Sequence, residues 1–107
     1  MKNYKVYWTN SAKYDLESII EYIKIDSIEL AKDIFLQIKK ACNDLYTFPN
    51  RGRIVPELKS IGIFKYREII LKRWRIIYKI DKNIVYILFI ADSRRNLEDI
   101  LFERLIK

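Results

Sequence analysis

The first half of the chain places its apolar residues at helical spacing. A short strand is predicted over Lys5–Thr9, where β-branched and aromatic residues run into residues that cap helices. Beyond it, one apolar stripe recurs every three or four residues, at Ala12, Leu16, Ile19, Ile20 and Ile23. Charged residues, Asp15 among them, are assigned to the other face. A capping-box candidate at 26–29 then opens a second stripe that reaches Phe48-Pro49. Two adjacent helices joined by so short a turn predict an antiparallel hairpin.

The second half changes to the pattern of a sheet. Both prolines and both glycines fall between Pro49 and Gly62, so we expect the main loop over Asn50–Gly62. Three strands are predicted after it, over Phe64–Leu71, Trp74–Ile80 and Ile84–Ala91. The third is apolar on both faces and should therefore lie inside the sheet. Helical spacing returns over Asn96–Lys107 and predicts a short terminal helix.

The predicted order is β-α-α-β-β-β-α. This order indicates an α+β fold in which an antiparallel-dominated sheet packs on a helical hairpin. A chain of 107 residues has the common size of one compact domain, so we expect a single domain over residues 1–107.

Positive charge is concentrated in one part of the sequence. The segment from Pro49 to Lys82 holds ten basic and three acidic residues, while the remainder holds eleven of each. All of the formal net charge of +7 thus comes from this segment. We expect it to form one exposed basic patch that attracts phosphates or an acidic protein.

The other features of the composition point to an ordinary globular protein of the cytoplasm. The single cysteine, Cys42, cannot form an internal disulfide and falls on the inner side of the second predicted helix. The amino-terminal residues include no apolar run of signal-peptide length, and the apolar stretch Ile84–Ala91 is too short to cross a bilayer. We therefore expect no membrane association.

These elements and their local motifs together resemble the RelE/ParE toxin superfamily of type II toxin–antitoxin systems. The resemblance runs over nearly the whole chain and is specific through the order and spacing of its parts. The residues that carry it are Ala12-x-x-Asp15-Leu16-x-x-Ile19-x-x-Tyr22-Ile23, Ala31, Leu45 to Arg53 (LYTFPNRGR), Val55-Pro56-Glu57-Leu58, Tyr66-Arg67-Glu68-Ile69, Arg75-Ile76-Ile77-Tyr78, Ile87-Leu88-Phe89-Ile90 and Arg94-Arg95.

Within the superfamily the chain is more similar to ParE. The long hairpin, the FPNRGR turn and the Val-Pro-Glu-Leu segment are ParE-like traits. The resemblance implies a toxin that inhibits DNA gyrase, arrests growth, serves plasmid stabilisation and forms a hetero-oligomer with a cognate acidic antitoxin. The alternative is the RelE branch, whose members act on the ribosome as endoribonucleases that cut messenger RNA.

The residue types favour the inhibitor over the nuclease. Cleavage of RNA by its 2′-hydroxyl needs a general base, a general acid and cations for the phosphorane, and the sequence contains no histidine. Where RelE-like enzymes place a tyrosine on the terminal helix, this chain has Leu97, Ile100, Leu101 and Phe102. No metal and no cofactor is expected. If the protein is nonetheless a nuclease, a metal-independent site would use Glu57, or else Glu68, as the base with a group of arginines, namely Arg67, Arg73, Arg75 and Arg94.

The expected contacts with a target or with the antitoxin are cations and aromatic rings. Trp74, Tyr78 and Phe102 are expected to receive apolar anchors of the antitoxin, while the arginines meet its carboxylates. The full candidate set is Arg51, Arg53, Arg67, Arg73, Trp74, Arg75, Tyr78, Arg94 and Arg95. An ordinary structural role stays open for some of them: Arg75 as the solvated side of an edge strand, and Arg67 as a partner of Glu68 or Asp92.

Overall fold

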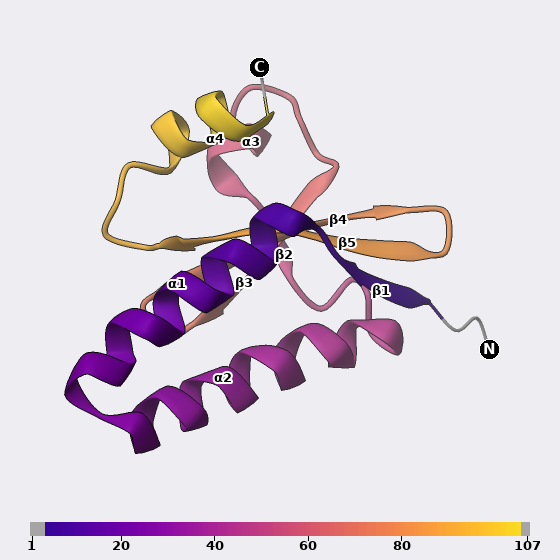
Figure 1. Ribbon diagram of the computed structural model, residues 1–107. Helices are drawn as coiled ribbons and strands as arrows, with labels where there is room; N and C mark the ends of the chain where they lie inside the picture. The colour runs from indigo at the N-terminus through magenta and orange to yellow at the C-terminus, as the bar shows by residue number, and fades with distance from the viewer. Residues whose placement is uncertain (1–3, 106–107) are drawn as a thin grey trace.

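Helices cover both faces of a five-stranded sheet in the computed structural model, which describes residues 4–105 (Figure 1). In chain order the elements are β1 (Lys5–Trp8), α1 (Asn10–Asp26), α2 (Ile28–Asn43), the 3-10 turn η1 (Asp44–Tyr46), β2 (Arg53–Ile54), α3 (Pro56–Lys59), β3 (Tyr66–Leu71), β4 (Trp74–Asp81), β5 (Ile84–Asp92) and α4 (Leu97–Leu105). The strand order is β1-β5-β4-β3-β2, and only the β1–β5 pair is parallel. The predicted α+β fold is confirmed. The predicted terminal helix is also present, although its last two residues, 106 and 107, lie outside the described part. No helix within residues 4–105 is long and apolar enough to cross a membrane.

Side-chain caps fix both helices of the hairpin. Thr9 caps α1 by accepting a hydrogen bond from the Ala12 amide at 3.2 Å. Ser27 caps α2 in the same way, accepting from the Leu30 amide at 3.1 Å. The capping box predicted at 26–29 is wrong by one residue, because the N-cap is Ser27 and not Asp26. Glu29 is therefore the second helical residue, one position before the one from which a glutamate bonds the backbone amide of the cap. Cys42 is buried on the inner side of α2, as predicted.

The strand β5 is apolar on both faces because helices cover both, and a bulge changes which of its residues face each side. Ile77 pairs with Phe89 whereas Tyr78 pairs with Ile87, so Leu88 is the extra residue. The alternation of side chains between the two faces is therefore reversed beyond the bulge. Ile87 and Ile90 both face the hairpin, while Phe89 packs under α4. Since β5 lies between β1 and β4, the prediction of an interior strand is confirmed.

The predicted loop 50–62 contains two short elements that the sequence pattern did not indicate. β2 pairs with β3, and α3 begins with Pro56 at its first position, where a missing amide hydrogen leaves no bond unmade. The Tyr78 hydroxyl ties this segment to the core: it donates to the Pro49 carbonyl at 2.7 Å and accepts from the Gly52 amide at 2.9 Å. Arg67 adds a hydrogen bond to the Gly52 carbonyl at 2.7 Å.

The carboxyl-terminal part of β5 has no neighbouring strand on its outer side, because β1 pairs only with Ile84 to Ile87. Side chains of the α1 region satisfy this edge. The Thr9 hydroxyl lies 2.8 Å from the Ile87 carbonyl oxygen, and Asp15 Oδ2 accepts from the Ile90 amide at 3.0 Å. The assignment of Asp15 to the solvated face is therefore wrong: it is buried, and it faces the sheet edge.

Candidate functional site

The predicted arginines do not form one patch. Strand alternation places Arg53 and Arg75 on the sheet face covered by α3 and α4, because they share that face with Glu68 and Ile77. Arg67 pairs with Tyr78 and lies on the opposite face, toward the hairpin. A third set, Arg73, Arg94 and Arg95, comes from the β3–β4 turn and from the connection between β5 and α4. The expectation of a single basic patch is wrong, since a period of two separates residues that are close in sequence.

A chain of ion pairs occupies the sheet face beneath α3 and α4. Arg75 Nε donates to Glu68 at 2.6 Å, and its two terminal nitrogens bind Glu57 at 2.8 and 2.9 Å. Arg53 binds the second oxygen of Glu68 at 2.7 Å. The Glu68 side chain is fully buried and Arg75 is nearly so, which makes this network a clamp between β2, β3, β4 and α3.

This network bears on the nuclease hypothesis. The hydrogen bonds from Arg75 hold the pKa of Glu57 below its usual value, and the Glu57 contacts raise that of Arg75. A carboxylate with a lowered pKa that is bound by a guanidinium is a poor general base. The structural alternative for Arg75 as part of an edge strand is also wrong, because β4 is the middle strand of the sheet.

The predicted aromatic anchors differ in their exposure. Tyr78 is fully buried and Trp74 is 6% exposed, both in the core beneath the hairpin, so neither offers a surface to a partner. Burial raises the pKa of the Tyr78 hydroxyl. Phe102 is 67% exposed on α4 and remains accessible.

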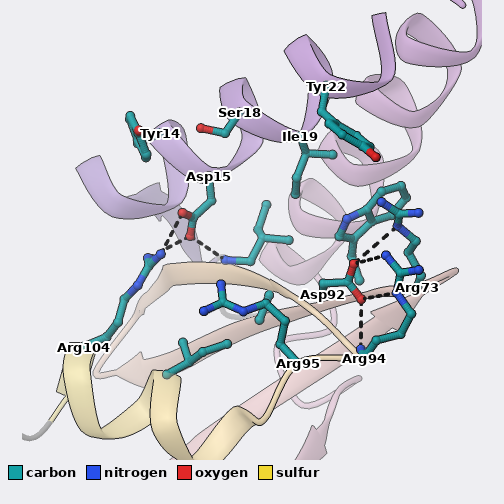
Figure 2. Close-up of a pocket in the computed structure, with 14 residues that line it drawn as sticks. Tyr14, Asp15, Ser18, Ile19, Tyr22, Arg73, Asp92, Arg94, Arg95 and Arg104 are labelled. Carbon is teal, nitrogen blue, oxygen red and sulfur yellow. Dashed lines mark hydrogen bonds and ion pairs between the residues drawn. The ribbon is translucent and has the colours of Figure 1, made fainter. Parts of the chain in front are cut away.

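The third set of arginines lines a pocket of about 490 Å³ between α1, α4 and the adjoining ends of β4 and β5 (Figure 2). Arg104 of α4 joins Arg73, Arg94 and Arg95, so four guanidinium groups line it. Two carboxylates, Asp15 and Asp92, lie among them. Tyr14, Ser18 and Tyr22 form the α1 wall.

Both carboxylates of the pocket are fully engaged. Asp15 binds the two terminal nitrogens of Arg104 at 2.8 and 3.0 Å, and it also accepts from the Ile90 amide. Asp92 accepts from Arg94 Nη2 at 2.8 Å, from its Nε at 3.1 Å and from its backbone amide at 2.9 Å. These Arg94 bonds lower the pKa of Asp92 to about 2.

This pKa predicts an acid-dependent contribution to stability. The pKa of Asp92 is lower in the fold than its ordinary value of 3.8, so its stabilising effect is complete above about pH 4 and lost as the pH falls toward 2. In urea unfolding, the stability difference between wild type and Asp92→Asn should be largest near neutrality and should shrink below pH 4. A difference that stays constant from pH 7 to 2 would contradict the assignment.

Sequence reasoning missed the α1 wall and Arg104. One signal was present: Asp15 falls three residues after Ala12 and four before Ile19, so it stands on the apolar stripe. An acidic residue in that position has to find a cation when it is buried. Nothing comparable marked Tyr14 or Ser18, and Tyr22 stood out only as part of the family motif; all three lie at exposed helical positions.

The comparisons with known proteins agree with this architecture. The family model described as ParE toxin of type II toxin–antitoxin system, parDE, matches residues 6–97. A solved structure of the chromosomal ParDE toxin–antitoxin system from P. aeruginosa superimposes with a TM-score of 0.69 at 20% identity, covering 86% of this chain and 98% of that one. The toxin–antitoxin complex RelBE2 from Mycobacterium tuberculosis gives 0.60 at 21% identity, covering 84% and 98%. No curated protein matches the sequence.

Proposed function

The chain belongs to the ParE toxin family of type II toxin–antitoxin systems, and from this premise we propose that it inhibits DNA gyrase by binding, without a catalytic step of its own. The action would take place in the cytoplasm, with a cognate acidic antitoxin as the neutralising partner.

The observation that carries the proposal is that both faces of the sheet are covered. The hairpin of α1 and α2 packs on one face, and α3 and α4 pack on the other (Figure 1). On the second face Ile77 and Phe89 are almost completely buried. An RNA strand laid across the sheet for cleavage would need that face to be open. A covered sheet with long outer helices fits a protein that acts through contacts of its surface.

The state of the arginines supports the same choice. Arg75 is held by two carboxylates, Arg94 by Asp92, and Arg67 by backbone carbonyl groups. Each of them would have to leave its partner before it could stabilise a phosphorane, which costs free energy that a preorganised catalytic site does not lose. The ribosome-dependent endoribonuclease is therefore the second candidate.

The decisive experiment measures both activities of the purified toxin. We expect micromolar toxin to block supercoiling of a relaxed plasmid by gyrase, and we expect no new message ends in a translating extract. Addition of the antitoxin should restore supercoiling, which controls for contaminating nucleases. Unimpaired supercoiling together with cut messages would reject the inhibitor and support the nuclease.

The proposed partnership with an antitoxin has its own test. The P. aeruginosa and M. tuberculosis proteins are described as parts of toxin–antitoxin systems or complexes, and the net charge of +7 here is complementary to an acidic protein. The acidic protein encoded beside the toxin should co-purify with it, and the complex should weaken as salt rises. Separate elution of the two at low salt would refute the pairing.

A further inference from the structure

We propose that the pocket between α1, α4 and the ends of β4 and β5 binds a phosphate ester, the group that links nucleotides in nucleic acids. This inference goes beyond the proposed function, since inhibition of gyrase by a protein contact requires no phosphate site. It depends on the charge, the free hydrogen-bond donors and the shape of the pocket.

The pocket keeps an excess of positive charge after its internal pairs are counted. Four guanidinium groups face two carboxylates. Asp15 and Asp92 direct their oxygens at Arg104 and Arg94, so their charges are neutralised within the wall. Arg95 is exposed and makes no ion pair within residues 4–105, which leaves its whole guanidinium available. A pocket of this kind attracts an anion.

Arg73 supplies a cation that is already held in place. Its Nε is buried without a hydrogen-bond acceptor in the described part of the chain, and the nearest carboxylate oxygen, on Asp92, is 3.6 Å away. The guanidinium group lies over the ring of Trp74, 5.2 Å from its centroid. A stacked guanidinium loses little further freedom on binding, and since the Arg73 side chain is 42% exposed, its other N–H donors are open to an incoming oxygen.

The opposite wall contributes hydroxyl groups and rings. Tyr14, Ser18 and Tyr22 of α1 face the arginines across the pocket (Figure 2), and no hydrogen bond between described residues uses their hydroxyls. Donors thus surround the space on several sides, which suits the tetrahedral oxygens of a phosphate better than the planar pair of a carboxylate. The two tyrosine rings, at 70% and 64% exposure, can stack with a nucleobase.

The size of the pocket fits the same ligand. Its volume of about 490 Å³ lies within the range of roughly 300–1,000 Å³ that is usual for small-ligand pockets. Its lining includes the exposed residues Tyr14, Ser18, Tyr22, Arg94 and Arg95, so a longer strand can enter from solvent on that side. A nucleotide and one unit of a nucleic-acid backbone are both compatible with these dimensions.

The test measures the fluorescence anisotropy of a labelled single-stranded DNA 12-mer titrated with toxin. Arg95→Ala should weaken binding about tenfold, the loss expected for one charge-assisted hydrogen bond, and should lower the salt dependence by about one released ion. Lys59→Ala removes the same charge from the exposed end of α3, outside the pocket, and should change affinity less than about twofold. Circular dichroism must show that both variants keep the fold.

Competitors identify the source of the phosphate. Displacement of the strand by adenosine monophosphate indicates a free nucleotide, whereas resistance to it indicates the backbone of a strand; both uphold a phosphate site. The proposal is overturned if wild type fails to bind the 12-mer, if Lys59→Ala weakens binding as much as Arg95→Ala, or if only an acidic peptide binds at Arg95.

The gyrase assay separates this proposal from the proposed function. A wild-type toxin that blocks supercoiling but fails to bind the 12-mer overturns the pocket and leaves the proposed function intact. A wild-type toxin that binds the 12-mer through Arg95 and fails to block supercoiling overturns only the proposed function.

Discussion

Replacement of Arg75 by methionine is expected to lower the free energy of unfolding by about 3–5 kcal/mol, the cost of breaking a buried ion pair from one side. Glu68 is fully buried and would keep only Arg53, whose side chain is 58% exposed. Glu57 would lose both of its bonds to the guanidinium group. Urea unfolding at pH 7 followed by circular dichroism measures the loss.

A surface pair provides the matched control for this prediction. Arg51 lies 3.5 Å from Asp44 and is about half exposed. Arg51→Met should therefore cost less than about 1 kcal/mol. If the Arg75 variant is no less stable than the Arg51 variant, the buried network does not make the expected contribution to stability.

Replacement of Gly52 by alanine should cost about 3 kcal/mol or more. A Cβ atom at this position would overlap the backbone carbonyl oxygen of Glu68 and would lie 2.7 Å from the Tyr78 hydroxyl. Overpacking of a rigid site costs about 1–3 kcal/mol, and displacement of Tyr78 would leave a buried hydroxyl without its bonds to Pro49 and Gly52, about 1–3 kcal/mol more. Thermal and urea unfolding would measure the change.

Gly62 distinguishes steric overlap from backbone preference. It has a φ of +83°, and a Cβ there would meet nothing within 4 Å. Gly62→Ala should therefore cost only about 1 kcal/mol, from the left-handed backbone alone. Equal losses for the two glycine variants would show that crowding at Gly52 is not the cause.

The helices and main strands could be predicted because their periods are long and consistent. The apolar stripes of α1 and α2 extend over four turns each, and β3 to β5 have the alternation or the apolar runs of strands. β2 and α3 could not be predicted in this way, because two and four residues are too few to show a period. The only local signal for α3 was Pro56 followed by Glu57, which is typical of a first helical turn.

The candidate site was less predictable because its geometry depends on pairing in three dimensions. The sequence shows Arg53, Arg67 and Arg75 close together, but only the register of the strands decides which face each occupies. Their carboxylate partners come from other elements, as Glu57 does for Arg75. The arginines of the pocket were identified except for Arg104, whose partner Asp15 lies 89 positions away in the chain.

The two outermost strands of the sheet offer little backbone to which a further strand could pair. These strands, β1 and β2, are four and two residues long, and Thr9 and Asp15 satisfy part of the edge that β5 leaves open. Amyloid-like association begins where a long, flat row of unpaired amides and carbonyls is available to another molecule. A chain that is half hydrophobic thus offers few places for such growth, and this should let it accumulate at high concentration without forming fibrils.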